Sequence, residues 1–270
     1  MAFITLGDLR LWYDIRGHGP RVVFLPGTAS DLRQALTIFA SPLVEHFEVL
    51  SFDQRGIGQS NSPDPDPTMV DYASDVKKVV EALGWEQCAC IGESFGGMVA
   101  QEFALQYPDV VDKLVLVVTS SGGAGGSSFP FHDYDVASMT VEERAAFWVR
   151  CGDSRVSQPQ WQEKHPEIYH HQYHAYVQVF QLGAANPERA VNSARQMHAR
   201  KLHNTYDRLP QLTMPTYICG GRYDHVAPLA NQLALLQPIP QARLSVFHGS
   251  HMVLWQDPLA FQSIRDFLLG

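Results

Sequence analysis

Ser94 stands in a sequence context that is typical of a nucleophilic serine. It lies in the pattern Gly-x-Ser-x-Gly at residues 92–96, directly after the apolar run 87–91 and before a helical pattern. This order predicts a strand, a sharp turn and a helix, with the serine hydroxyl exposed on the turn. Glycines two residues before and after the serine avoid the collisions that side chains would make in such a strained turn. We therefore interpret Ser94 as a nucleophile.

A serine hydroxyl needs a general base beside it and an acid that orients that base. Where such a serine turn follows a strand of a mostly parallel sheet, the acid and then the histidine come later in the chain. Each lies just beyond the end of a later strand. Asp224 and His251 each follow an apolar run, and a Gly-Ser turn precedes the histidine. We predict that these two residues complete the arrangement with Ser94, in preference to the neighbouring His225 and His248.

An oxyanion that forms during acyl transfer requires two backbone N–H donors. One is the amide of the residue after the nucleophile, Phe95, and the other comes from the loop after the third strand. In that loop, residues 25–30, we predict Thr28 as the donor and keep Ala29 as the alternative.

The elements that must position these residues alternate between strands and helices over the first 119 residues. Buried strands are predicted over 22–25, 49–52, 87–91 and 114–118, after two strands over 3–6 and 9–15. Helical patterns occupy 32–43 and a segment that Thr68 caps and that ends near Leu83. The alternation predicts an α/β fold with a mostly parallel, doubly wound sheet.

The alternation stops after residue 119 and resumes at 209. Residues 120–208 have no convincing strand pattern, and they carry many aromatic and histidine residues at helical spacing. We predict a core formed by residues 1–119 and 209–270, with residues 120–208 as an inserted helical lid, or cap. An insertion at this point lies over the carboxyl edge of the sheet.

The lid is dense in aromatic side chains, and several of them should line a cleft above Ser94. The rings that we expect to bind substrate are Phe147, Trp148, Tyr173 and Tyr176. They predict a preference for apolar or aromatic substrates over short, doubly charged ones. The alternative is a pocket organised by cations such as Arg195 or Arg200.

The lid histidines raise the question of a metal. His170 and His174 lie four residues apart and could share one helix face, as metal ligands do. No carboxylate stands between them, and a serine arrangement already supplies the chemistry. We predict neither a metal nor another cofactor.

Composition excludes several classes of function. The 270 residues carry a net charge of −8, and no run of lysine or arginine exceeds two residues, which argues against a nucleic-acid partner. No apolar stretch approaches the length of about 18 residues typical of a membrane span. The N-terminus lacks the basic start of a signal peptide, and the four cysteines lack disulfide or zinc spacing. We expect a cytoplasmic protein that does not bind membranes; homo-oligomer formation stays open.

These motifs together resemble those of the α/β-hydrolase superfamily. The resemblance covers nearly everything outside the lid, on residues 26–28, 53–60, 92–97, 220–224 and 249–251. Pro26 departs from the histidine that the family usually carries there. The serine at position 94 differs from the aspartate of epoxide hydrolases and haloalkane dehalogenases. The segment 197–209 is similar to the lid exit of 3-oxoadipate enol-lactonases.

The resemblance implies a serine hydrolase that cleaves a small carboxylic ester or lactone through an acyl-enzyme, without a cofactor. One alternative keeps the same three residues and cleaves a carbon–carbon bond in an aromatic ring-fission product, with Arg195 or Arg200 on the dienolate. Another alternative is a non-catalytic ligand receptor on the same fold. The complete set of serine, histidine and aspartate weighs against the receptor.

Overall fold

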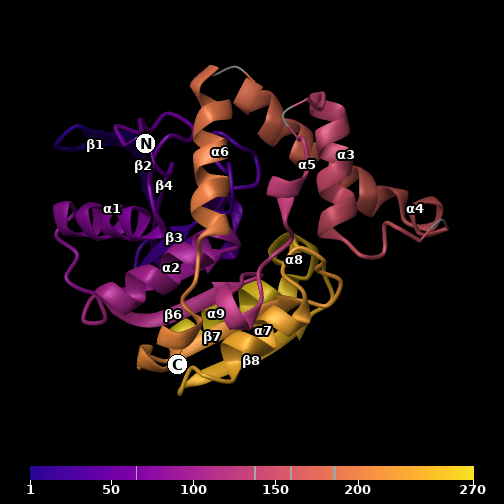
Figure 1. The fold of residues 1–270 in the computed structure, drawn as a ribbon. Helices are drawn as coiled ribbons and strands as arrows, with labels where there is room; N and C mark the ends of the chain where they lie inside the picture. Colours follow the sequence, from indigo (N-terminus) through magenta and orange to yellow (C-terminus); the bar gives the residue numbers. More distant parts are fainter. Residues whose placement is uncertain (65, 137, 159, 185–186) are drawn as a thin grey trace.

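A computed structural model describes residues 1–64, 66–136, 138–158, 160–184 and 187–270 of the chain. At its centre is an eight-stranded sheet with the strand order β1-β2-β4-β3-β5-β6-β7-β8 (Figure 1). The strands are β1 (Ala2–Leu6), β2 (Leu9–Arg16), β3 (Arg21–Leu25), β4 (Glu48–Phe52), β5 (Cys88–Glu93), β6 (Val111–Val117), β7 (Thr216–Gly221) and β8 (Ala242–Phe247). β1 and β2 pair antiparallel, and β3 to β8 are parallel to one another. The predicted mostly parallel sheet is therefore confirmed.

Helices cover both faces of this sheet. One face packs against α1 (Met69–Ala82), α2 (Phe95–Gln106) and α7 (Leu229–Leu236). The other face packs against the 3₁₀ turns η1 (Ile38–Ala40) and η2 (Pro42–Glu45) and against α8 (Val253–Gln256) and α9 (Pro258–Leu269). This arrangement is the doubly wound one that the alternating pattern predicts.

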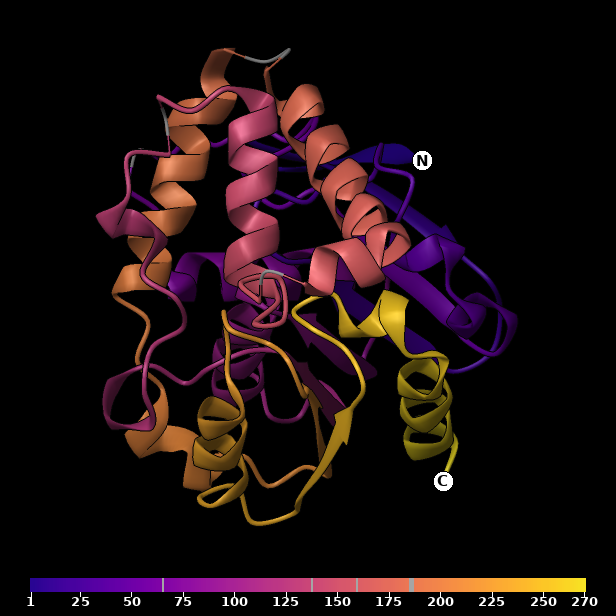
Figure 2. The ribbon, with the colours of Figure 1, turned by 90° about the vertical axis from the view of Figure 1, so that its right-hand side faces the viewer.

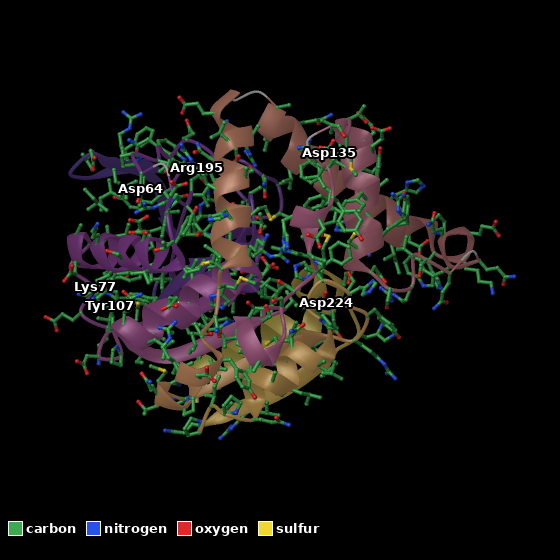
Figure 3. All side chains as sticks on the ribbon, viewed as in Figure 1. Asp64, Lys77, Tyr107, Asp135, Arg195 and Asp224 are labelled. Carbon is green, nitrogen blue, oxygen red and sulfur yellow. The ribbon has the colours of Figure 1, made fainter. Side chains whose placement is uncertain are left out.

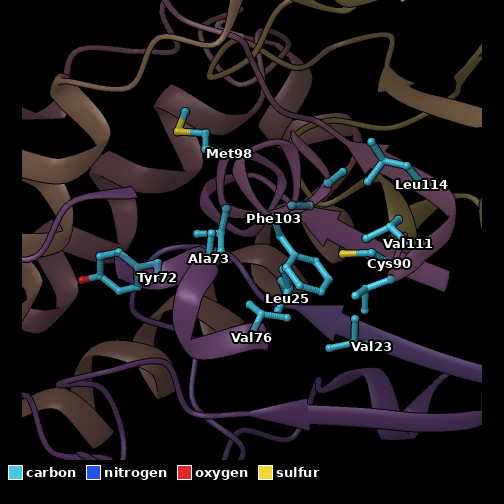
Figure 4. Packing of buried hydrophobic residues seen from close by; sticks show 14 of the residues in the cluster. Val23, Leu25, Tyr72, Ala73, Val76, Cys90, Met98, Phe103, Val111 and Leu114 are labelled. Atoms are coloured by element: carbon cyan, nitrogen blue, oxygen red, sulfur yellow. The ribbon is translucent and has the colours of Figure 1, made fainter. Parts of the chain in front are cut away.

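The strand β3 shows how the sequence builds the two faces. Val23 and Leu25 lie in the cluster that also contains Val76 of α1 (Figure 4). Val22 and Phe24, which alternate with them, belong to the cluster on the opposite face. A strand that is buried on both faces reads as a continuous apolar run, because successive side chains point in opposite directions.

The prediction of a helix over residues 32–43 is wrong. This segment forms turns followed by η1 and η2, and Pro42 stands at the first position of η2. Distant side chains hold this segment in another conformation: Leu32 donates its N–H to the Asp53 carboxylate and Ala35 donates its N–H to Oε1 of Gln178. Proline in a helix interior also removes a donor and clashes with the preceding turn.

Between β6 and β7 the chain forms a separate layer of helices. Its elements are η3 (Gly123–Gly125), η4 (Phe131–Asp133), α3 (Val141–Gly152), α4 (Trp161–Lys164), α5 (Pro166–Ala184), α6 (Pro187–Lys201) and η5 (Tyr206–Gln211). α3, α5 and α6 stand side by side above the sheet (Figures 1 and 2). None of the helices in the described part of the chain has the length and apolar character needed to cross a bilayer.

Candidate active site

Ser94 occupies the turn between β5 and α2 with an unusual backbone conformation. Its φ of 54° and ψ of −114° lie in a region that residues other than glycine rarely adopt. A Cβ atom on Gly96 would lie 1.9 Å from the carbonyl oxygen of Leu25, and one on Gly92 would lie 2.4 Å from the carbonyl oxygen of Gly96. Both flanking glycines are therefore required by close backbone approach, as the sequence predicts.

The structure brings Asp224, His251 and Ser94 into one hydrogen-bonded chain. Nε2 of His251 lies 2.9 Å from Oγ of Ser94, and Nδ1 of His251 lies 2.9 Å from Oδ2 of Asp224. The buried Asp224 carboxylate also accepts from the amides of Val226 at 2.8 Å and Ala227 at 3.0 Å, which fix its orientation. An ionised carboxylate only accepts hydrogen bonds, so Nδ1 is the donor and Nε2 is left to accept the serine proton.

The end of α3 holds the two loops that carry the acid and the histidine. The amide of His251 donates to the carbonyl of Gly152 at 3.1 Å, and the amide of Ser154 donates to the carbonyl of Tyr223 at 3.0 Å. Asp153 and Asp224 form an isolated antiparallel bridge. These backbone bonds fix the relative positions of the two loops.

The competing histidines lie elsewhere. Nε2 of His248 lies 3.0 Å from the hydroxyl of Tyr223 at the surface. The ring of His225 packs edge-to-face on Phe129, with ring centroids 6.1 Å apart. Neither histidine lies in the cleft that contains Ser94.

The two residues that the sequence predicts as oxyanion donors, Phe95 and Thr28, lie next to Ser94 in the chain and in the lining of its cleft, respectively. Phe95 is the first residue of α2, so its N–H has no partner within the helix. Thr28 lines the cleft, in a loop so close that a Cβ on Gly27 would lie 3.5 Å from Cβ of Ser94. The alternative donor, Ala29, already donates its N–H to Oε1 of Gln196 at 3.0 Å. The geometry thus favours Thr28 over Ala29.

Ser94 and His251 open into a cleft of about 130 Å³. A second cavity of about 600 Å³ lies between α3, α5 and α6. Thr28, Trp148 and Tyr176 line both spaces, so the two are neighbours along one wall. Trp148 and Tyr176 thus lie where the sequence places them, above the serine.

Phe147 and Tyr173 do not reach the cleft, which corrects the expectation for these two rings. Phe147 packs in an aromatic cluster with Tyr134, whose ring centroid lies 5.1 Å away, and with Phe131. Tyr173 stacks on Tyr169 along α5, with ring centroids 6.1 Å apart. Each residue of a helix is rotated by about 100° from the last, so a ring next to a cleft residue faces another direction.

Arg200, named from the sequence as a cation that could organise the pocket, lines the cleft, together with residues that the sequence does not single out. These further residues include Glu93, Gln34, Leu36, Val179, Met197, Met252 and Trp255. Position along the chain could have found Met252 and Trp255, which closely follow His251. The loop residues Gln34 and Leu36 were hidden by the incorrect helix prediction.

The carboxyl group of Glu93, in the wall of the cleft, has a raised pKa. Burial raises the pKa of this carboxyl to about 7, and the imidazolium form of the nearby His251 would lower it. Among the described residues no group of three histidine, cysteine, aspartate or glutamate side chains could hold a metal ion. His170 and His174 instead stack on each other along α5, with ring centroids 6.2 Å apart.

Comparisons with known proteins agree with this architecture. An uncharacterized protein of Mycobacterium tuberculosis is 33% identical over 123 residues, which are 46% of this chain and 35% of that protein, so the match spans about a third of that relative. A poly(3-hydroxyalkanoate) depolymerase of Ectopseudomonas oleovorans is 26% identical over 80% of this chain and 72% of its own length. The crystal structure of the enol-lactonase from Burkholderia xenovorans LB400 has a TM-score of 0.79 at 20% identity, with 100% of both chains covered.

The last likeness is one of fold, because the identity is low. The family model described as alpha/beta hydrolase fold matches residues 20–258, which is most of the chain. The strand order, the serine turn and this match lead to one conclusion: the chain belongs to the α/β-hydrolase fold family.

Proposed function

We propose that the protein is a serine hydrolase that cleaves a small carboxylic ester or lactone. The observation that carries the proposal is the hydrogen-bonded chain from Asp224 through His251 to Ser94. It supplies a nucleophile, a base in reach of the nucleophile's proton and an acid that fixes the base. An enol-lactonase and a depolymerase of a polyester among the similar proteins support the same bond type.

In the first half of the reaction, Oγ of Ser94 attacks the carbonyl carbon while Nε2 of His251 takes its proton. The carbonyl oxygen becomes an oxyanion, which the amides of Phe95 and Thr28 stabilise. His251 then gives the proton to the leaving oxygen, the bond between carbonyl carbon and leaving oxygen breaks, and the acyl group stays on Ser94. The carboxylate of Asp224 stabilises the imidazolium that exists between these transfers.

In the second half, water attacks the acyl-enzyme. His251 takes a proton from the water, and the same two amides hold the second oxyanion. Collapse of this intermediate returns the proton from His251 to Oγ of Ser94 and releases a carboxylic acid. With a lactone, the leaving hydroxyl remains on the same product molecule.

The lid, residues 120–208, is proposed to determine the substrate. Trp148 and Tyr176 lie above the serine, and the cavity of about 600 Å³ beside them has room for a bulky apolar group. Each buried methylene contributes about 0.8 kcal/mol, which is close to a fourfold gain in kcat/KM where the cavity has room.

A hydrolysis panel tests the proposed function. It compares aryl esters of graded acyl length, simple lactones, an enol-lactone and a ring-fission dienone, each with the intact protein and with Ser94→Ala. Turnover of an ester or lactone that requires Ser94 supports the proposal. Turnover of the dienone alone supports the carbon–carbon bond hydrolase instead. Tight binding of these compounds without turnover supports the receptor.

A further inference from the structure

Arg200 of α6 is a buried cation with no carboxylate beside it. The residue is 8% exposed, and none of the ion pairs among the described residues includes it. Its guanidinium donates to Oγ of Ser128 at 2.7 Å and makes a long contact of 4.0 Å with the sulfur of Met197. The guanidinium carbon also lies 5.0 Å from the ring centroid of Phe131.

The other buried arginines of the described chain are paired. Arg55 bonds to the Asp75 carboxylate at 2.6 Å, and Arg189 bonds to the Asp31 carboxylate at 2.7 Å. Buried charges are rarely left without such a partner. Residues 65, 137, 159, 185 and 186, which lie outside the description, include no aspartate or glutamate. Arg200 is therefore an exception that needs an explanation.

The burial of Arg200 has an energetic cost that an anion would relieve. Burial alone lowers the pKa of Arg200 to about 10. The group still carries its charge at neutral pH, because this value lies about three units above it. A buried charge without a counter-charge destabilises the fold, whereas a bidentate carboxylate satisfies two of the guanidinium donors at once.

Arg200 belongs to the wall of the cleft that contains Ser94 and His251. Phe131 and Trp148 supply apolar surface in the same wall. The acidic side chain in the described lining is Glu93, and the ion pairs among the described residues include none between Glu93 and Arg200. Glu93 therefore does not serve as the partner of Arg200.

Arg195 of the same helix provides a contrast. Its guanidinium donates to Oδ1 of Asn192 at 2.8 Å, and it lines neither the cleft nor the larger cavity. In Figure 3 it lies on the side of α6 away from Asp224. Of the two arginines that the sequence singles out, Arg200 faces the reaction site.

We propose that Arg200 binds a carboxylate that the substrate carries in addition to its scissile ester or lactone. This inference rests on the proposed hydrolase function and deepens it: the substrate is a monoanion with an apolar body against Phe131 and Trp148. It combines the apolar pocket that the lid rings predict with the alternative of a pocket cation, Arg200. It keeps the expectation that a doubly charged substrate is disfavoured, because a second carboxylate near Ser94 meets Glu93.

The test compares matched substrates that differ in one charge. The mono-4-nitrophenyl esters of glutaric, adipic and suberic acids (half-esters) carry a free carboxylate. In the matched diesters, this carboxylate is a methyl ester and the 4-nitrophenyl ester is kept. We expect the intact protein to prefer the best half-ester over its methyl diester by about 50-fold in kcat/KM. Arg200→Met should abolish this preference and leave the diester within about threefold, and Arg200→Lys should retain part of it. The control Arg195→Gln should behave as the intact protein.

If Arg200→Met lowers kcat/KM equally for the half-ester and the diester and also lowers Tm, Arg200 acts only in packing. If the proposed binding is correct, Arg200→Met should melt at the same or a higher temperature, because it removes an unpaired buried charge. Calorimetry with Ser94→Ala and the half-ester measures binding without turnover. Binding that does not depend on Arg200 contradicts the inference. Absence of turnover in the intact protein contradicts the proposed function and leaves this binding readout intact.

Discussion

The amide of Ala29 donates a hydrogen bond to Oε1 of Gln196, 3.0 Å away in space and 167 residues away in the sequence. Gln196 belongs to α6 and is 1% exposed, and Ala29 has a positive φ of 58°. Arg189 of the same helix donates to the carbonyl of Ala29. Two lid side chains thus hold both polar groups of the residue that follows Thr28. They hold the loop that contains Thr28, the second oxyanion donor in the proposed mechanism.

We expect Gln196→Leu to lower kcat by about tenfold and to leave KM within about twofold on an aryl ester. The variant removes the hydrogen bond that holds the loop of Thr28, the proposed oxyanion donor, and it removes no group that lines the cleft. Stabilisation of the transition state should therefore decrease, while binding of the substrate should not change. Gln162→Leu, an exposed glutamine of the same lid, is the matched control and should keep both parameters. A rise in KM with kcat unchanged would show that Gln196 instead shapes substrate binding.

His251→Ala should lower kcat/KM by about 10⁴-fold, and His248→Ala and His225→Ala should keep most of the activity. The base must be neutral to take a proton, so kcat/KM of the intact protein should rise with pH through the range where histidine deprotonates. Steady-state kinetics from about pH 5 to pH 9 checks both statements. The opposite ranking of the variants would overturn the assignment.

Glu93 should make the fold less stable as pH rises. Its pKa in the folded protein is about 7, against an ordinary value of 4.5, so the unfolded chain gives up this proton first. The stability that the protonated carboxyl contributes is present below about pH 4.5 and is lost as pH rises through about 7. Glu93→Gln removes this dependence.

The difference in Tm between Glu93→Gln and the intact protein should therefore grow by a few degrees between about pH 5 and pH 8. Thermal melting at several pH values measures it. Glu86→Gln, at an exposed glutamate, is the control and should show a constant difference. A difference that shrinks with pH would mean that Glu93 is stabilised in its ionised form.

Gly96→Ala should destabilise the fold far more than Gly84→Ala. A Cβ at position 96 would lie 1.9 Å from the Leu25 carbonyl, so β3 and α2 must separate. Gly84 has a positive φ of 70° but nothing within 4 Å of a Cβ, so its substitution should cost only about 1 kcal/mol. Chemical denaturation compares the free energies of unfolding. Similar losses in the two variants would contradict the close approach at the serine turn.

Local signals made most of the core predictable. Thr68 caps α1 through a capping box with Asp71, and the sequence predicts this start from the residue type alone. The serine turn was predictable because the backbone passes so close to Gly92 and Gly96 that no residue with a Cβ atom fits there. Asp224 and His251 followed from their positions just beyond parallel strands, since such strands end at one edge of the sheet.

The loop over residues 32–43 and the lid were less predictable, because long-range contacts determine them. The amides of Leu32 and Ala35 donate hydrogen bonds to the side chains of Asp53 and Gln178, and no local sequence pattern reveals these contacts. The directions of Phe147 and Trp148 depend on the rotation of α3 above the sheet. Arg200 is distinguished from Arg195 only by which side of α6 meets the cleft.

The proposed function requires that Ser94 is the nucleophile. The most direct measurement is labelling with a fluorophosphonate, followed by intact mass and peptide mapping of the intact protein and of Ser94→Ala. We predict one adduct per chain, on Ser94, with activity lost in proportion to labelling. We also predict no adduct on Ser94→Ala, which should remain folded and lose several orders of magnitude in turnover. Labelling of another serine, with hydrolysis retained by Ser94→Ala, would show that Ser94 is not the nucleophile.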